Sequence, residues 1–575
     1  MQIKENPKVF DVCVIGSGAG GGMAAKTLTE AGADTVLLEA GPDIDIANTD
    51  MFKWPYHTPR RGGSTPEKPF GEFDLAYGGW NIEGEPYTHV SGTSFQWFRS
   101  RMMGGRTNHW GRISLRFGPL DFKRKSIDGL GDDWPIGYDD LKPYYDKVDK
   151  MIGIFGSKEG IYNEPDGHFM PAPKPRAHEL LIKKACNELN IPIIPNRLSI
   201  ITKPLGNRAA CHYCNQCNRG CATSSNFQSS TVLIPPAKGT GKLTLITMAM
   251  AREILTDKSG QATGVSYVNK LDGMEYTVKA KIVVVAGGAC ETGRLFMNSK
   301  SAMHPNGLGN GSGVLGKYLM DSTGASMGGF IPSMVDGVRH NQDGVGGAHL
   351  MIPWWGNDMK LDFPRGYHIE IGGGTGVPRA GFGGGIEGRN KVLGDIDGKP
   401  RKSGGGYGKQ LKNDYRRLYG ANVGFAGRGE PIALESNYCE IDPNVVDKYG
   451  IPVLKFHYKW TDHEILQAKH MQDTFEEIIH AMGGTPTRPK PGKESNYGLA
   501  APGAIIHEVG VARMGKDPNS SVVNEYCQVH EAKNVFVADG ASFVSMADKN
   551  PTWSILALSL RTSEYIIDEM KKGNL

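Results

Sequence analysis

Apolar runs and glycine-rich turns alternate at the start of the chain. The run Phe10–Ile15 is short, apolar and rich in β-branched residues, so it predicts a buried strand. A glycine-rich turn follows, then a helix-like segment at 23–28, and then a second apolar run, Thr35–Leu38. Much further along, the alternating segment Val453–Tyr458 predicts a strand before a helix over 462–482. This pattern predicts a mixed α/β protein that opens with a parallel βαβ unit.

The first glycine-rich turn has the spacing G-x-G-x-x-G at Gly16, Gly18 and Gly21. Between a strand and a helix this spacing indicates a dinucleotide site: Gly16 makes the turn, Gly18 admits a pyrophosphate to the helix N-terminus, and Gly21 lets the helix pack closely. Glu39 ends the second strand, where a carboxylate accepts hydrogen bonds from ribose hydroxyls and repels a 2′-phosphate. These residues predict FAD or NAD and disfavour NADP. The alternative is a glycine-rich turn in an ordinary α/β domain.

The composition is that of a globular protein with a large core, since 39% of the 575 residues are hydrophobic and 22% are charged. The 65 basic and 61 acidic residues leave a net charge of only +4. With no basic block and no nucleic-acid motif, we expect no nucleic-acid partner. The apolar runs fall far short of the ~20 residues that a membrane helix needs, so any membrane contact is expected to come through partner proteins. The first residues contain neither an apolar signal core nor a twin arginine.

Four of the nine cysteines, Cys211, Cys214, Cys217 and Cys221, form the run C-x-x-C-x-x-C-x-x-x-C. Bacterial ferredoxins use this spacing to hold an iron–sulfur cluster, because thiolates a few residues apart on a tight loop can each reach a different iron. Three local ligands suit a [3Fe–4S] cluster, whereas a [4Fe–4S] cluster needs all four thiolates or a distant one. A structural zinc site, with His212 as a nitrogen ligand, and a disulfide pair are the alternatives.

Three later segments carry cofactor-like motifs. Arg101–Gly111 reads RMMGGRTNHWG, Ile282–Leu295 reads as strand, turn and helix, and Asn534–Ser542 ends in Asp-Gly-Ala-Ser. In order and spacing they resemble the glucose–methanol–choline (GMC) oxidoreductases, a flavoprotein family. The resemblance extends from about residue 11 to about residue 570 and is weakest between about 330 and 430.

The resemblance implies an FAD-binding Rossmann-like domain assembled from discontinuous segments, with an inserted substrate domain that contains an antiparallel sheet. The expected FAD-binding segments are 1–120, 241–309 and 501–575, and the expected substrate segments are 121–240 and 310–500, with the cysteine loop at 211–221. The glycine-rich tract 372–424 is expected to be a solvated loop, with a cover over the substrate entrance or a partner contact as the alternative.

The resemblance also assigns roles to residues. His507 aligns with the catalytic histidine and is the expected general base, because an alcohol loses its hydroxyl proton as its hydride passes to flavin. Asn550 takes the position of the partner that orients the substrate hydroxyl, and His109 is a secondary candidate. The further cofactor contacts that the resemblance implies are Gly104, Gly105, Thr107, Asn108, Ala251, Asp539 and Gly540.

Within the family, the cysteine run resembles the iron–sulfur-containing FAD subunits of sugar and gluconate dehydrogenases. Cys211, Cys217 and Cys221 match their arrangement and Cys214 is extra, which favours [3Fe–4S]. The resemblance implies electron transfer from FAD through the cluster to a cytochrome or quinone, with a small export-chaperone subunit and a cytochrome c subunit as partners. The protein would then be periplasmic by co-export, with a cytoplasmic location as the alternative.

The substrate expected from this resemblance is a sugar or glucoside, with oxidation at C3 of glucose or glucosides favoured. Gluconate 2-oxidation, fructose oxidation and glucose C1 oxidation are the rivals. Two hypotheses of other kinds are a flavin alcohol oxidase with a structural zinc site and a non-catalytic electron-transfer flavoprotein.

Overall fold

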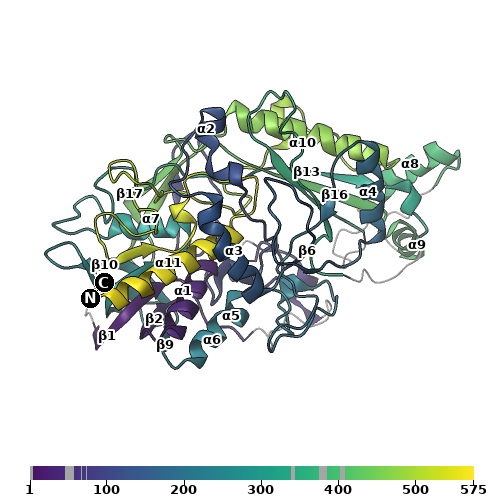
Figure 1. Ribbon diagram of the computed structural model, residues 1–575. Helices are drawn as coiled ribbons and strands as arrows, with labels where there is room; N and C mark the ends of the chain where they lie inside the picture. The colour runs from purple at the N-terminus through teal and green to yellow at the C-terminus, as the bar shows by residue number, and fades with distance from the viewer. Residues whose placement is uncertain are drawn as a thin grey trace.

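The computed structural model describes residues 4–45, 57–65, 68–72, 74–337, 344–374, 385–401 and 408–575 (Figure 1). The α-helices are α1 (Ala19–Glu30), α2 (Arg124–Asp128), α3 (Tyr138–Ile152), α4 (Ala177–Glu188), α5 (Ser229–Val232), α6 (Ile234–Gly239), α7 (Ala289–Asn298), α8 (Ile386–Asp397), α9 (Gly408–Leu418), α10 (Asp462–Ala481) and α11 (Thr552–Lys572). The strands are β1 (Lys4–Ile15), β2 (Thr35–Leu38), β3 (Gly78–Gly79), β4 (Thr88–His89), β5 (Arg99–Ser100), β6 (Phe155–Gly156), β7 (Met170–Pro171), β8 (Ile194–Pro195), β9 (Leu243–Ile246), β10 (Ala249–Thr256), β11 (Ala262–Asn269), β12 (Glu275–Val285), β13 (Thr323–Phe330), β14 (Leu350–Ile352), β15 (Tyr367–Gly373), β16 (Asn422–Gly429), β17 (Tyr438–Val446), β18 (Pro452–His457), β19 (Thr485–Pro486) and β20 (Val535–Val537). No helix among the described residues has the length and apolar character to cross a bilayer.

A seven-stranded sheet organises the first half of the fold. Its order is β10-β11-β12-β1-β2-β9, and β20 pairs with the C-terminal part of β12. The central strands are parallel, so that Ile15 of β1 lies opposite both Leu38 of β2 and Val285 of β12. Because parallel strands share one C-terminal edge, the loops that follow β1, β2, β12 and β20 meet there.

The two faces of this sheet are covered by different elements. Val12 and Val14 of β1 pack in one apolar cluster with residues of α1 and α11, and these two helices lie against each other (Figure 1). Cys13 and Ile15 point to the opposite face and belong to the largest core cluster. The alternation follows from the two-residue period of a strand.

A six-stranded antiparallel sheet, in the order β19-β13-β16-β15-β14-β8, forms the second half. The helices α10 and α4 cover one of its faces (Figure 1). Tyr367, Ile369 and Ile371 of β15 point to these helices and are buried with apolar residues of α10. The intervening residues of β15 therefore point to the other face, toward the first sheet.

The mixed α/β fold with one mostly parallel and one antiparallel sheet confirms the predicted fold class. The predicted domain boundaries stay a prediction. Within the segment 121–240, α3 packs against α11, and α5 and α6 pack against α1, which covers the first sheet. Within the segment 310–500, β17 and β18 pack against α7, and β18 pairs with the early strand β4.

The glycine-rich tract 372–424 differs from the expected loop. Its described part contains α8, α9 and the start of β16, because Ile386, Leu393 and Leu418 give these helices an apolar side that packs on Phe330. Of the glycine clusters at 383–385 and 404–406, all but Gly385 lie outside the described residues.

Candidate functional site

The turn between β1 and α1 is shaped to hold a ligand close to the backbone. Gly16 has φ +91°, and a Cβ there would lie 2.4 Å from the carbonyl oxygen of Ala286. A Cβ on Gly21 would lie 1.8 Å from the carbonyl oxygen of Gly16, whereas a Cβ on Gly18 would meet no protein atom within 4 Å. Helix α1 begins without a capping side chain or an acidic residue in its first turn, so its first amides are free for an anion.

Glu39 lies buried at the end of β2 and is held by local donors. Its carboxylate accepts hydrogen bonds from the Ser17 amide at 3.1 Å and the Gly41 amide at 2.8 Å. Burial raises its pKa, although these donors oppose the shift. The carboxylate lines the cavity described below, where it can accept further hydrogen bonds from a ribose.

The second glycine-rich segment forms a tight turn beside the first. Gly104 has φ +86°, and its amide donates to the Ser17 hydroxyl at 2.8 Å. The Asn108 side chain donates to the Met103 carbonyl oxygen at 2.7 Å and accepts from Ser230 at 2.6 Å. These contacts give Gly104 and Asn108 a structural part in the loop.

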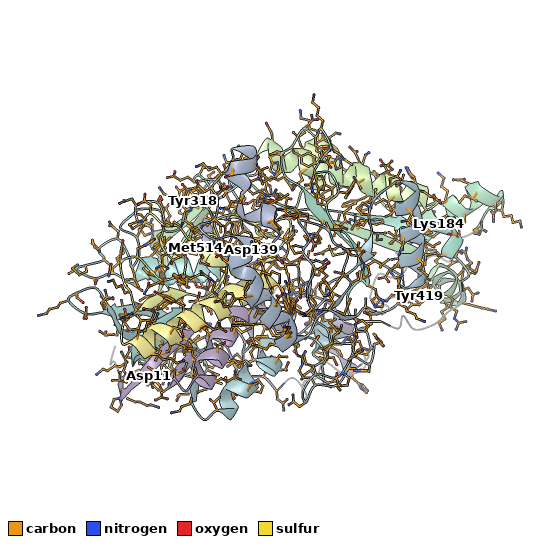
Figure 2. The ribbon with its side chains drawn as sticks, viewed as in Figure 1. Asp11, Asp139, Lys184, Tyr318, Tyr419 and Met514 are labelled. Carbon is orange, nitrogen blue, oxygen red and sulfur yellow. The ribbon has the colours of Figure 1, made fainter. Side chains whose placement is uncertain are left out.

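A cavity of about 1970 Å³ opens at the C-terminal edge of the parallel strands. It is larger than the roughly 300–1,000 Å³ of most small-molecule sites, and its lining extends to Tyr419, which follows the last residue of α9 and is labelled in Figure 2. The predicted residues that line it are Gly16, Gly18, Glu39, Gly105, Thr107, Ala251, Asp539, Gly540, His507, Asn550, Cys214 and Cys217. The predicted residues outside the lining are Gly21, Gly104, Asn108, Cys211 and Cys221.

Asp539 ties the end of β20 to the start of α7. Its carboxylate accepts from the Gly288 amide at 2.8 Å, the Thr292 hydroxyl at 2.6 Å and the Ala541 amide at 2.9 Å. Burial raises its pKa against these donors. Asp539 therefore fixes two of the loops that form the cavity wall.

His507 and Asn550 meet in this cavity although they come from separate segments. His507 lies in the loop before β20, and Asn550 lies two residues before the start of α11. The Asn550 side-chain nitrogen lies 3.3 Å from Nε2 of His507, and the Ser322 hydroxyl lies 3.0 Å from Nδ1. If the amide donates to Nε2, the imidazole proton is on Nδ1 and faces Ser322. Nε2 is then the atom that can accept a proton.

The backbone around His507 is held on both sides. Its amide donates to Asp321 at 2.8 Å. Arg106, from the second glycine-rich turn, donates to the Ile506 carbonyl oxygen at 3.2 Å and pairs with Glu508 at 2.6 Å. Ile506 has φ +66°, which is unusual for a β-branched residue. These contacts keep the histidine segment in a conformation that it would not adopt alone.

The site has shifted acid–base properties. Burial lowers the pKa of His507 to about 3, with the charge of Arg428 as the next cause and the charge of Glu370 opposing it. Burial raises the pKa of Asp321 to about 7, although the His507 amide favours its charged form. At neutral pH the imidazole is therefore a neutral base.

Sequence reasoning missed a charged group on β15 and β16. Glu370 lines the cavity and accepts a hydrogen bond from Asn550 at 3.3 Å. Arg428 pairs with Glu370 at 3.2 Å, and Nε2 of His368 lies 3.6 Å from the Glu370 carboxylate. The alternation of polar His368 and Glu370 with apolar neighbours was the signal in the sequence that could have placed both on one face of a strand.

His109, the secondary candidate, lines the cavity in an aromatic setting. Its ring packs against Phe70 and Phe98, with ring centroids 6.1 and 5.4 Å away. Burial lowers its pKa to about 3, assisted by the charges of Arg106 and Arg112. Among the described residues, its Nε2 atom is buried without a hydrogen-bond partner. His109 thus lines the same cavity as His507 and Asn550, in an aromatic part of its wall.

The cysteine loop lies at the border of the same cavity. Cys217 is buried against Gly346, Cys214 is exposed, and Cys211 and Cys221 are half-buried. Burial raises the pKa of Cys211 to about 11, and the charges of the other three thiols add to this shift. All four are free thiols, so the disulfide alternative is not formed.

The four thiols of the cysteine loop are not arranged as a metal site. In the described part of the chain, which includes the whole cysteine loop, no group of three or more His, Cys, Asp or Glu side chains is arranged to hold a metal ion. The thiols as placed fit neither the predicted cluster nor the zinc alternative.

Comparisons with known proteins agree on one family. The sequence models of the GMC oxidoreductases match residues 82–322 and 435–559. The 2-methyl-1,2-propanediol dehydrogenase of Mycolicibacterium austroafricanum is 29% identical, over 97% of this chain and 95% of its own. The fructose dehydrogenase large subunit of Gluconobacter japonicus is 25% identical over 98% of both chains, and paromamine 6'-oxidase of Streptomyces fradiae is 25% identical over 99% of this chain and 93% of its own. The solved structure of pyridoxine 4-oxidase from Mesorbium loti aligns with a TM-score of 0.59 at 17% identity, over 97% of this chain and 99% of its own, which supports the fold.

Proposed function

Because the chain belongs to the GMC oxidoreductase family, we propose that it is an FAD-dependent dehydrogenase that oxidises a hydroxyl group of a sugar or glucoside. Members of this family bind FAD and act on CH–OH groups. The single observation that carries the proposal is the meeting of His507 and Asn550 in the cavity beside the glycine turn. That pairing gives a neutral base and an amide donor at the position where a hydroxyl can react.

The residues of the cavity fit FAD. The free first amides of α1 and the open space at Gly18 suit the pyrophosphate, and Glu39 suits the ribose. When bound, FAD supplies the hydride acceptor. Ala251 and Thr107 would contribute to the rest of the binding surface.

In the proposed reaction, the substrate hydroxyl lies beside Nε2 of His507 and the side chain of Asn550, within reach of both. Nε2 accepts the hydroxyl proton as the carbon loses its hydride. Ser322 accepts a hydrogen bond from the Nδ1 proton, which leaves Nε2 unprotonated. Arg106 and Asp321 hold the backbone on either side, so the base is positioned before the substrate arrives.

The relatives support polyhydroxylated substrates. One is named for a diol, others for fructose, gluconate and C-glycosides. Within this range we favour oxidation at C3 of glucose or a glucoside to the 3-keto sugar. Gluconate 2-, fructose and glucose 1-dehydrogenation are the alternatives.

The test is to mix the flavoprotein anaerobically with a panel of sugars and glucosides and to follow bleaching of the flavin. Carbon NMR of the product then identifies the oxidised carbon. His507→Ala should retain FAD but slow flavin reduction at least about 100-fold, because general-base catalysis contributes about 10²–10⁴-fold. The matched control is His480→Ala, a change at an exposed histidine on α10. Flavin reduction by His507→Ala at the wild-type rate would contradict the assignment.

We also propose that the cysteine loop holds an iron–sulfur cluster, with [3Fe–4S] favoured, which passes electrons to a cytochrome or quinone. The spacing of the four cysteines supports this. The side chains would have to move together to bind it. Export with a small chaperone subunit, a cytochrome c partner and a periplasmic location belong to the same proposal.

Metal and sulfide analysis of anaerobically purified protein tests this second proposal. We expect iron, acid-labile sulfide and an electron paramagnetic resonance signal of the oxidised protein, all of which Cys217→Ser should reduce. Cys186→Ser, in α4, is the matched control. Zinc without iron would instead support a flavin alcohol oxidase with a structural zinc site, an alternative that the oxidases among the relatives favour.

A further inference from the structure

A carboxylate lies directly beside the proposed catalytic pair. Glu370 projects from β15 into the cavity that also contains His507 and Asn550. Its Oε1 atom is 3.3 Å from the Asn550 side-chain nitrogen, and that nitrogen is itself 3.3 Å from Nε2 of His507. One amide group thus bridges the base and the carboxylate.

The surroundings of Glu370 keep it ionised. Burial by itself raises the pKa of its carboxyl, but the positive charge of Arg428, together with His368, more than offsets this and lowers the pKa below its usual range. An ionised carboxylate only accepts hydrogen bonds and offers about four lone-pair sites. The described groups that approach the Glu370 carboxylate are the Asn550 amide at 3.3 Å, Arg428 at 3.2 Å and His368 at 3.6 Å, fewer than its lone-pair sites. Acceptor capacity is left for a ligand.

The orientation of Asn550 follows from this carboxylate. Because Glu370 cannot donate, the amide must turn its NH₂ group toward it. The same NH₂ group then faces His507, and the Asn550 carbonyl oxygen is buried without a partner among the described residues. The Asn550 nitrogen is 3.3 Å from both Nε2 of His507 and the Glu370 carboxylate. A hydroxyl that reacts at Nε2 therefore lies close to Glu370.

Neighbouring hydroxyl oxygens on a sugar ring lie about as far apart as two hydrogen-bonded atoms. A substrate with one hydroxyl at His507 can therefore place the next hydroxyl at Glu370. We propose that Glu370 accepts a hydrogen bond from the hydroxyl adjacent to the one oxidised, so that the enzyme selects vicinal diols. This inference rests on the proposed function and names the substrate class of the same site.

The charge balance favours a neutral diol over an amine. Arg428 pairs with Glu370, and Arg106 pairs with the nearby Glu508. An ammonium group in place of the second hydroxyl would bring a charge to a site whose carboxylates are already compensated. A hydroxyl brings a donor without a charge.

The experiment crosses enzyme variants with substrate variants. Wild type, Glu370→Ala and Glu370→Gln are each reduced anaerobically by the best glucoside and by its analogues that lack one hydroxyl next to the oxidised carbon. An amino analogue is the third substrate. We expect kcat/KM of wild type to fall at least about 100-fold for one deoxy analogue, because a site built to bind a hydroxyl discriminates strongly against its loss. In Glu370→Ala, kcat/KM for the parent glucoside should exceed kcat/KM for this deoxy analogue by no more than about threefold, because the parent substrate loses its hydrogen bond to Glu370.

Several outcomes would overturn the inference. An unchanged ratio in Glu370→Ala, with both substrates slowed equally, would show that Glu370 only positions Asn550. An amino analogue that outperforms the diol would show that the carboxylate binds cations. Glu275→Gln is the matched control, since Glu275 is buried, lies 3.5 Å from Arg252 and does not line the cavity.

Two further readouts separate other failures. FAD content and melting temperature show whether a variant is folded. If Glu370→Ala is not folded, the kcat/KM values of Glu370→Gln for the parent and the deoxy substrates are compared instead. If no sugar reduces the wild-type flavin, the proposed function fails, and the comparison of 1,2-propanediol with 1-propanol tests the diol requirement separately. Equal rates with these two alcohols would then overturn it.

Discussion

At the scale of single residues, the properties of His507 depend on neighbours that are distant in sequence. Ser322 precedes β13, Arg428 lies in β16 and Asn550 precedes α11. Ser322 and Asn550 select the tautomer of the imidazole, whereas burial and then the charge of Arg428 disfavour its protonated form. The base strength of this site is thus a product of the assembled fold.

The first residue-scale prediction concerns pH. An unperturbed histidine loses its basic form below about pH 6.5, but the pKa of His507 is lowered to about 3. As pH falls from 8 to 5, kcat/KM for flavin reduction should therefore show no loss of the kind that a histidine of ordinary pKa would cause. Stopped-flow measurements over this range check it.

A matched variant tests the cause of this shift. Arg428→Gln removes the positive charge that disfavours the imidazolium, so the pKa of His507 should rise and activity should be lost as pH falls through the new value. Because the pKa of Asp321 beside the His507 amide is raised to about 7, the profile is also measured in Asp321→Asn. An acid limb near pH 6.5 that persists in this variant would show that His507 is unshifted or is not the base.

At this scale the sequence allowed some residues to be placed and not others. His507 and Asn550 stand in segments that resemble family motifs, and the structure brings them together. Glu370 is a single carboxylate in a strand, and only the pairing of β15 with β16 gives it Arg428 as a neighbour. Such a contact depends on strand register, which one chain does not reveal.

At the scale of elements, the turn before α1 separates two uses of glycine. Gly21 is required for packing, because a side chain there would overlap the Gly16 carbonyl group. Gly18 has φ −63° and no neighbour where a Cβ would lie, so the protein itself does not require glycine at this position. We therefore expect glycine at this position to serve the approach of a ligand.

The paired substitutions Gly18→Ala and Gly21→Ala test this difference. Gly21→Ala should destabilise the apoprotein by about 1–3 kcal/mol or more through overpacking. Gly18→Ala should leave apoprotein stability within about 1 kcal/mol but weaken FAD binding at least about tenfold, which corresponds to about 1.4 kcal/mol.

Urea unfolding of the apoproteins and FAD titration provide the two readouts. Full FAD affinity in Gly18→Ala would show that the pyrophosphate does not approach this glycine. Unchanged stability of Gly21→Ala would contradict the packing role.

The elements with strong periodicity were predicted well, and those without were not. The strands β1, β2 and β18 and the helices α1 and α10 lie where apolar spacing predicted them. The helices α8 and α9 in the glycine-rich tract were not predicted, because they contain many charged residues and only a few apolar residues, which pack on Phe330. Tertiary packing outweighed a composition typical of loops.

At the scale of the whole molecule, buried ion pairs connect distant parts of the chain. Lys549 is 2% exposed, and its ammonium group lies 3.1 Å from Asp121 and 2.6 Å from Asp548. Arg197 pairs with Glu164 at 3.0 Å next to this group. Because Lys549 adjoins Asn550 in the chain, the network that joins the segments also supports the proposed active site. No local pattern predicts such a network, since its members meet only in the folded chain.

The position of β20 has a consequence for how the protein is made. This strand pairs with β12 in the sheet that begins with β1, so the dinucleotide domain is complete only when residue 537 has left the ribosome. At about 5–20 residues per second, synthesis of the chain between β12 and β20 takes roughly 12–50 seconds. During that time part of the β12 edge is unpaired and open to wrong partners. The newborn chain therefore needs protection until its last segment arrives. Products truncated before residue 507 lack both His507 and Asn550, and products truncated between these residues lack Asn550.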